Sequence, residues 1–456
     1  MQDDQKLTDD VLAAYSEQNP PQPKVPVQQL PIADNQIPVT VTETEQPQIM
    51  NPETPQVSQV QQPLNNGPTV YSGLSGNELF CMNAIGYKPG NLVVGNSVYA
   101  IGFIGSQIAG IKTILGGEIK QVTNMIAGGR VEALNRLEKE IAANGGNGAT
   151  GVTSELIFHN NNVEFLSVGS TIHRIDNQAT PRITSSSDGQ EFFCQVDAGY
   201  MPIKFVFGNV AYSIGIGKSI IGELKELVRG EIQQYSDIFN TTRNLALERI
   251  TDEARKAGAN SVVGIRTTII PFGEEGVKEM VMIGTASYNE QISQLADSLG
   301  GVLTSDLTAI ETWNITKMGQ VPIKLILGTS VFSLGVIGGI KAAIRSIAKG
   351  EVNTLTELIY QAREQSMNRV KEQAQEIGAD DVLGIKTYIY QLDKDLVEFL
   401  AIGTATKRMP GVSTRSEQII PQAIIRDKAT FVDLSDSPSN ANLNNAPVSK
   451  INTDNV

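Results

Sequence analysis

The sequence predicts an α+β protein with three tandem β-β-α-β-β domains, each an antiparallel sheet packed by one long helix, between disordered N- and C-terminal tails. Three observations lead to this fold class. Glycines recur in register three times, each copy contains an amphipathic stretch long enough for a helix of about 25 residues, and the tails differ in composition from the body. Of the 20 prolines, 11 lie in residues 1–70, whereas 40 of the 42 glycines lie in residues 71–408.

The repeat is defined by six glycines whose spacing is the same in every copy. Adding 113 to the first set of positions gives the second set, and adding a further 120 gives the third. The sets are Gly86, Gly95, Gly102, Gly117, Gly145 and Gly151; Gly199, Gly208, Gly215, Gly230, Gly258 and Gly264; and Gly319, Gly328, Gly335, Gly350, Gly378 and Gly384. This register predicts a degenerate repeat 1 at residues 71–174, a linker at 175–190, repeat 2 at 191–289, a linker at 290–310 and repeat 3 at 311–408.

Each repeat is expected to open with an apolar strand and a second strand bounded by glycines, as in FVFGNVAYSIG of repeat 2. Its β-branched and aromatic residues favour strands, and the glycines would mark bends or close backbone approaches. A Gly/Ala-rich amphipathic turn follows, and then the long helix, whose apolar stripe ends before Gly258 in repeat 2. The alternation around Ile265, Thr267 and Ile269 predicts a strand, and a polar turn joins it to a last strand.

The two tails are predicted to be disordered. Residues 1–70 contain 13 glutamines, and such a segment buries too little apolar area to offset its chain entropy. Residues 7–18 alone have the pattern of a short amphipathic helix, which we interpret either as a docking peptide or as a fraying helix. Residues 409–456 are rich in Ser, Asn and Pro, and within them Ile419, Ile420, Ile424 and Ile425 suit a strand on the body as an alternative.

Charge argues against nucleic-acid binding, and hydropathy predicts no membrane-spanning helix. The chain has 36 basic and 49 acidic residues, a net charge of -13, so it lacks the excess of Lys and Arg that holds a phosphate backbone. Its longest apolar stretches are interrupted by Gly, Ser and Lys, short of the roughly 18 to 20 uninterrupted apolar residues that a membrane span needs. The acidic N-terminus does not resemble a secretory signal, and a cytoplasmic location is expected.

Charged residues at repeated positions are the candidate binding residues. Arg130, Arg243 and Arg363 occupy one position of the long helix, away from its apolar stripe, and Glu164, Glu279 and Glu398 flank the last strand. We expect the arginines to pair with these glutamates, as surface or inter-subunit ion pairs. The alternative is that the arginines bind an anion or an acidic tail in a pore shared by several chains.

Metal-ligand residue types are scarce. The chain has two Cys and two His, in none of the spacings of a zinc site. Cys81 and Cys194 share one repeat position, beside aromatic residues in the predicted first strand, and buried packing is their main interpretation. The version of a metal site that we retain is a ring of thiolates supplied by one Cys per chain, for a divalent or soft metal. No other cofactor is predicted.

No catalytic arrangement emerges from the sequence. It contains no Ser/His/Asp or Cys/His set, no carboxylate pair with acid–base spacing and no nucleotide-binding fingerprint. We therefore expect the protein not to be an enzyme.

The repeats resemble a known family. Gly199, Gly208 and Gly230 with Tyr235, then Arg243 and Ala246, followed by GANSVVGI and IGTA, are similar to the YbjQ-like heavy-metal-binding domain. Repeat 3 carries the pattern with GADDVLGI and IGTA, and repeat 1 departs from it with GGNGATGV and VGST. The resemblance implies a small bacterial α+β domain that assembles as a ring, typically a pentamer. Five parallel chains would then give three stacked rings, one for each type of repeat.

The resemblance and the missing catalytic groups together favour one function. We expect a non-enzymatic oligomeric binding or scaffold protein, a homo-oligomer whose tails tether protein partners. The alternative is a protein that sequesters a heavy metal or a small ligand at an inter-subunit site. Association with a membrane surface through the Gly-rich turns is a third interpretation.

Overall fold

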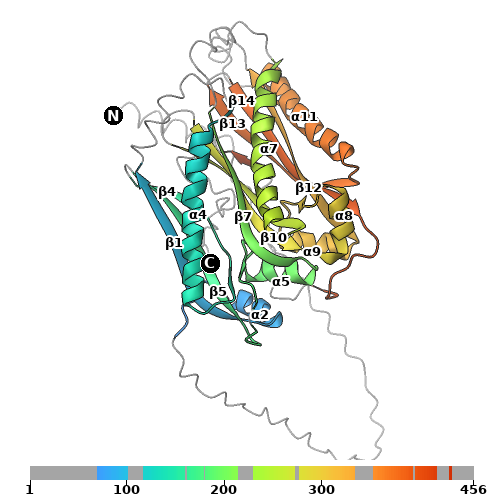
Figure 1. Cartoon of the computed structure of the whole chain (residues 1–456). Coiled ribbons are helices and arrows are strands. Elements are labelled where there is room, and N and C mark those ends of the chain that lie inside the picture. The colour runs from blue at the N-terminus through green and yellow to red at the C-terminus, as the bar shows by residue number, and fades with distance from the viewer. Residues whose placement is uncertain are drawn as a thin grey trace, which may run out of the picture. The chain divides into compact units, whose positions relative to one another are not determined.

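Three five-stranded sheets, each packed by one long helix, make up the described part of the chain (Figure 1). The computed structural model describes residues 69–100, 117–159, 162–178, 180–213, 230–272, 277–333, 353–393, 396–418 and 431–433. The predicted α+β class is confirmed. The predicted Gly/Ala-rich turns, the N-terminal tail before residue 69 and most of the C-terminal tail lie outside the described residues.

The elements follow one order in three successive units. Unit 1 contains α2 (Gly76–Ala84), β1 (Tyr87–Ala100), β2 (Gly117–Glu118), α4 (Lys120–Ala143), β3 (Gly148–Thr150), β4 (Glu155–His159) and β5 (Asn162–Arg174). Unit 2, after β6 (Ile183–Thr184), contains α5 (Gly189–Asp197), β7 (Met201–Ser213), β8 (Gly230–Glu231), α7 (Gln233–Lys256), β9 (Ser261–Pro271) and β10 (Val277–Tyr288). The segment between units 2 and 3 contains η1 (Glu290–Ile292), α8 (Ser293–Ser298) and β11 (Leu303–Thr304). Unit 3 contains α9 (Ala309–Lys317), β12 (Gln320–Ser333), α11 (Asn353–Glu376), β13 (Asp381–Asp393) and β14 (Leu396–Arg408). Strand β15 (Phe431–Asp433) follows it.

The first element of each unit is a helix, and the predicted first strand was wrong. In α2, Ser75 accepts a hydrogen bond from the Glu78 amide while the Glu78 side chain accepts one from the Ser75 amide, which is a capping box. Thr308 and Glu311 make the same box at the start of α9, and Asp188 caps α5. Cys81 and Cys194 therefore lie on helices, not on strands.

The remaining predicted strands are present, and they form antiparallel ladders. In unit 2 the central strand β10 pairs with β9 on one side and β7 on the other, so Met282 lies between Thr267 and Gly208. The strand orders are β1-β5-β3-β6 with β4 beside β5, then β11-β9-β10-β7-β2, then β15-β13-β14-β12-β8. A strand from the preceding unit thus completes the second and third sheets: β2 precedes the helix of unit 1 but pairs with β7 of unit 2, and β8 likewise pairs with β12 of unit 3.

Glycine in the long strand allows the helix to lie directly on the sheet. A Cβ atom built on Gly95, Gly208 or Gly328 would lie 2.1 Å from a backbone carbonyl oxygen of α4, α7 or α11 respectively. No side chain fits at that distance, so the close backbone approach predicted for these glycines is confirmed. Each helix then covers its own sheet with an apolar stripe, in which Ile250 and Ala254 of α7 are fully buried.

Residues 409–418, which belong to the predicted C-terminal tail, are among the described residues and are bonded to unit 2. The backbone amide of Arg415 donates to the carbonyl oxygen of Asp197 at 2.8 Å, and Ser416 donates its amide and hydroxyl to the Asp197 carboxylate at 3.0 and 2.7 Å. Further on, β15 pairs in parallel with β13. The strand suggested by Ile419 and its neighbours lies outside the described residues.

Candidate functional site

A buried ion pair joins unit 1 to unit 2. Arg130 of α4 is fully buried and donates from Nε and Nη2 to the two carboxylate oxygens of Glu279 in β10, at 3.1 and 2.7 Å. Glu279 is also fully buried and accepts a further hydrogen bond from Asn209 at 3.2 Å. A two-pronged contact of this kind is strong and directional. The arginine belongs to one unit and the glutamate to the next.

The same pair recurs between units 2 and 3. Arg243 of α7 donates from Nε to Glu398 of β14 at 2.8 Å and contacts it again through Nη2. Its guanidinium lies 5.5 Å from the ring centre of Tyr212 and 5.7 Å from that of Tyr390. Burial alone would lower the pKa of Arg243, but the charge of Glu398 raises this pKa above its usual value. The guanidinium is therefore a permanent buried cation.

The third arginine and the third glutamate lie in different units, Arg363 in unit 3 and Glu164 in unit 1, and they do not pair with each other. Arg363 of α11 is exposed, and its guanidinium makes no hydrogen bond or ion pair with a residue in the described ranges. Glu164 of β5 is partly exposed and accepts hydrogen bonds from Asn96 at 2.9 Å and His159 at 2.7 Å. These two hydrogen bonds lower the pKa of Glu164, which holds it as an anion. Arg363 is thus equivalent to the arginines of the two ion pairs between units, and Glu164 is equivalent to their glutamates. Neither is paired with a residue of the other kind from a neighbouring unit.

The exposure of apolar side chains differs in the same way between the two junctions and the outer surfaces of units 1 and 3. Ile126, Phe239 and Ile359 share one position of the long helix, and their exposed fractions are 0%, 2% and 39%. On the receiving strand the equivalent residues Val98, Ala211 and Val331 are 56%, 0% and 0% exposed. A helix face of units 1 and 2 therefore covers a strand of the following unit. At the corresponding positions Ile359 of α11 and Val98 of β1 are exposed in the described part of the chain.

Backbone hydrogen bonds reinforce both junctions. The amide of Ala211 donates to the hydroxyl of Thr123 on α4 at 2.9 Å, and the amide of Val331 donates to the hydroxyl of Ser236 on α7 at 2.8 Å. The two hydroxyls occupy one repeat position. The interface between units 1 and 2 and the interface between units 2 and 3 therefore use equivalent residues and hydrogen bonds.

A second ion pair crosses each junction. Arg249 of unit 2 contacts Glu118 of unit 1 at 2.6 Å, and Arg369 of unit 3 contacts Glu231 of unit 2 at the same distance. Arg136 is the equivalent residue of unit 1, and like the others it donates to a carbonyl oxygen of its own long strand, at 2.6 Å. Its carboxylate partner, however, is Glu132 on its own helix. Unit 1 therefore has the cation of a further junction.

The cysteines do not form a metal site in the described part of the chain. Cys81 and Cys194 are fully buried in one apolar cluster. Burial raises the pKa of Cys81 to about 11 and that of Cys194 to about 12, so both are neutral thiols at physiological pH, whereas metals bind the thiolate. The described residues contain no group of three or more His, Cys, Asp and Glu placed to hold an ion. These residues do not fit a heavy metal.

Comparison with known proteins identifies the repeats. The family model described as "Putative heavy-metal-binding", YbjQ, matches residues 87–170, 200–290 and 302–408. The chain belongs to the YbjQ family. The matches thus fall one in each unit and leave out both tails, and those in units 1 and 2 begin after the opening helices α2 and α5. No solved structure matches the chain at a significant level.

Relatives within and around the YbjQ family differ in length. The encapsulin nanocompartment protein Rv1762c of Mycobacterium tuberculosis is 29% identical over 235 residues, which is 50% of this chain and 87% of that protein. The UPF0145 protein TV0671 of Thermoplasma volcanium is 32% identical over 120 residues, 25% of this chain and 98% of that protein. A UPF0145 protein of Thermotoga petrophila is 41% identical over 90 residues, 19% of this chain and 81% of that protein. The latter two correspond to a fraction of the three-unit chain.

The described helices were also compared with the length and hydropathy that a membrane-spanning helix needs. None of those within the described ranges is both long and apolar enough to cross a bilayer. The Gly-rich turns that suggested contact with a membrane surface lie outside the ranges described above.

Proposed function

We propose that the protein is a non-enzymatic scaffold that binds further copies of itself head to tail, through the interface that already joins its own units. The observation that carries this proposal is the divided third pair, with Arg363 exposed at one end of the chain and Glu164 at the other. Two complete copies of the junction inside one chain supply the geometry for a third between chains. The name of the encapsulin nanocompartment relative supports an assembly role.

The two free surfaces are complementary in polarity as well as in charge. The α11 surface presents Ile359 and Tyr360 beside its arginine, and the β1 surface presents Val98 and Tyr99 near its glutamate. Burying such apolar groups provides most of the free energy of association, and the charged pair sets the register. The positions of Ile359 and Val98 are buried at both junctions within the chain.

This arrangement differs from five parallel chains in stacked rings. Within the chain the units contact each other through a helix face and a strand edge, so adding a chain continues the series 1-2-3-1-2-3. A heterologous contact of this kind closes into a ring if its rotation allows, and otherwise extends as a filament. In both cases the assembly grows by whole chains of 49.1 kDa.

Charge reversal tests the proposal. We expect native mass spectrometry to show multiples of the chain mass for the wild type and a single chain for Arg363→Glu or for Glu164→Arg, because each variant opposes like charges. Mixing the two variants restores association, since the new carboxylate of one variant then meets the new guanidinium of the other. Arg255→Glu, which changes an exposed arginine paired within α7, is the control and retains the wild-type mass. A monomeric wild type would refute the proposal.

Sequestration of a metal or small ligand is the weaker candidate. Two of the three arginines that suggested an anion site, Arg130 and Arg243, are already paired with buried carboxylates. Titration of the full chain with Zn²⁺, Cu²⁺ and Ni²⁺ tests this alternative directly, and stoichiometric binding would revive it.

A further inference from the structure

The turn that leads from the first helix of each unit into its long strand is covered differently in the three units. A Cβ atom built on Gly199 would lie 2.9 Å from the Gln291 side chain, and the amide of Met409 donates to the carbonyl oxygen of Gly319 at 2.8 Å. A Cβ built on Gly86 meets nothing within 4 Å among the described residues. The carbonyl oxygen of Gly86 accepts a hydrogen bond from the amide of Ile175 at 2.9 Å, so the segment after each unit reaches this turn. Among the described residues, however, a side chain packs closely on the turn glycine in unit 2, and none does so in unit 1.

Linker length explains the difference. Arg174 and Asn289 occupy equivalent positions in the repeat register, at and just after the end of the last strand, and Ile183 and Leu303 occupy equivalent positions in the strand ladders. Eight residues separate Arg174 from Ile183, and thirteen separate Asn289 from Leu303. The longer linker forms η1 and α8, in which Ile292 and Ala296 are fully buried in the cluster that contains Tyr200. The shorter linker contains no helix in its described residues.

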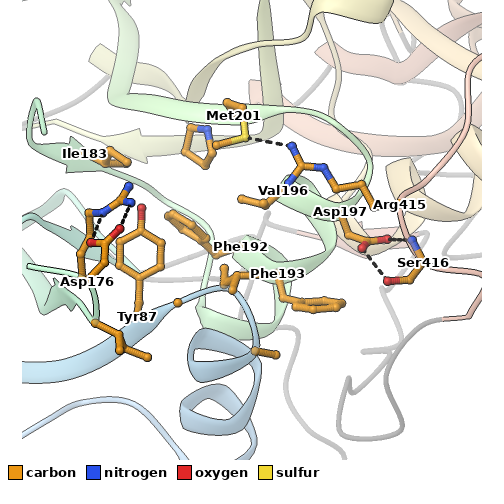
Figure 2. Close-up of a pocket in the computed structure, with 16 residues that line it drawn as sticks. Tyr87, Asp176, Ile183, Phe192, Phe193, Val196, Asp197, Met201, Arg415 and Ser416 are labelled. Carbon is orange, nitrogen blue, oxygen red and sulfur yellow. Dashed lines mark hydrogen bonds and ion pairs between the residues drawn. The ribbon is translucent and has the colours of Figure 1, made fainter. Parts of the chain in front are cut away.

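A cavity occupies the corresponding place at the first junction. Its volume is about 670 Å³, and Tyr87, Phe192, Phe193 and Val196 form its apolar wall (Figure 2). By the repeat register, Tyr87 corresponds to Tyr200 and Phe193 to Trp313, which lie in the same buried cluster as the two apolar residues of the α8 segment. The cavity is therefore the space that α8 fills one junction later.

One cation on the rim of this cavity lacks a carboxylate. Arg174 is paired with Asp176, and Asp197 is bonded to Ser416 and to the indole of Trp313. Arg415 is exposed, and among the described residues the one hydrogen bond of its guanidinium is to Met201 Sδ at 3.7 Å (Figure 2). The rim therefore offers a free positive charge beside an apolar wall.

We propose that this cavity binds a short helix of a partner protein, with two apolar residues four positions apart and an acidic residue that meets Arg415. The spacing is that of Ile292 and Ala296, which fill the equivalent space at the junction of units 2 and 3. Residues four positions apart share one face of a helix. This inference rests on the proposed scaffold function, since it describes a partner protein that the scaffold would bind. It names a second site, distinct from the surface that joins chains.

A peptide with the sequence of residues 289–301, NEQISQLADSLGG, is the probe. We expect its fluorescence polarisation to show saturable binding to the full chain, one peptide per chain, with Kd below about 1 mM. The same peptide with Glu at the positions of Ile292 and Ala296 does not bind. Arg415→Glu weakens binding at least about tenfold, the loss of one charge-assisted contact, and Met201→Trp, which enlarges an exposed residue on the cavity wall, abolishes it.

Arg182→Glu is the matched control, because this exposed arginine lies on the short linker outside the cavity and its reversal leaves binding unchanged. Native mass spectrometry of each variant separates the two proposals, since cavity variants keep the assembled mass. An assembled wild type that fails to bind the peptide, or binding that survives both Arg415→Glu and Met201→Trp, overturns the inference.

Discussion

A buried arginine whose carboxylate comes from another unit is a weak point in the stability of this fold. Glu279 accepts from Asn209 as well as from Arg130. Glu398 has no such additional donor, because Thr329 stands where Asn209 would be, and its Oε2 has no hydrogen-bond partner among the described residues. The charge of Glu398 is therefore compensated mainly by Arg243, and the second junction depends more heavily on one side chain than the first.

Removing that arginine should be costly. We expect Arg243→Met to lower the free energy of unfolding by about 3–5 kcal/mol, because it leaves Glu398 buried and unpaired. Arg363→Met, at the equivalent but exposed position, should change it by less than about 0.5 kcal/mol. Both are measured by urea unfolding in the Glu164→Arg background, in which chains do not associate. Similar costs for the two variants would contradict the asymmetry.

The thiols should be inert in the folded chain. Burial raises the pKa of Cys81 to about 11 and of Cys194 to about 12, from a value of 9.0 in the absence of burial. The unfolded state thus releases its thiol protons first, so this contribution to stability is complete below pH 9 and is lost as pH rises through 11 and 12. Alkylation by iodoacetamide at about pH 9 should be at least about 100-fold slower in the folded chain than in urea. Equal rates would show that the thiols are accessible.

Repeat register in the sequence identifies the charged residues but not their pairing. Arg130 and Glu279 are 149 positions apart in the chain. Nothing local distinguishes this pair from Arg130 with Glu164 of its own unit, because both glutamates occupy the same repeat position. Three-dimensional contact between units decides the matter, and a single sequence carries no record of it.

At the scale of elements, the long helices and the last two strands were predictable because they are long and strongly periodic. Helix α7 ends at Lys256, and Gly258 adopts φ +76° just beyond it, as its position suggested. The opening helices were missed because a nine-residue apolar segment fits a buried strand as well as a buried helix. The capping-box spacing of Ser75 with Glu78 was the available signal.

Glycines in these elements should respond to alanine in opposite ways. Gly208→Ala places a methyl group against the Ala246 carbonyl and should destabilise unit 2 by about 1–3 kcal/mol or more. Gly128→Ala, within α4 and with open space around it, should stabilise by up to about 1 kcal/mol. Urea midpoints of the two single variants provide the measurement. A neutral Gly208→Ala would mean that α7 can move away from β7.

At the scale of the whole molecule, the number of units and their order along the chain followed from composition and register alone. Their mode of contact did not, because the residues at the junctions are apolar and resemble core residues in the sequence. Ile126 and Phe239 face another unit, yet they fit the helical stripe of their own. Only the exposure of Ile359 at the third position shows that this face belongs to an interface.

The eight-residue linker between units 1 and 2 has a consequence for stoichiometry. A protein with one unit per chain that assembled through this interface would present the same junction at every step, and each junction would be equally open or equally filled. Three units with different linkers break that equivalence. In the assembly that we propose, the cavity between units 1 and 2 would occur once per chain, so the number of partner helices bound there would equal the number of chains.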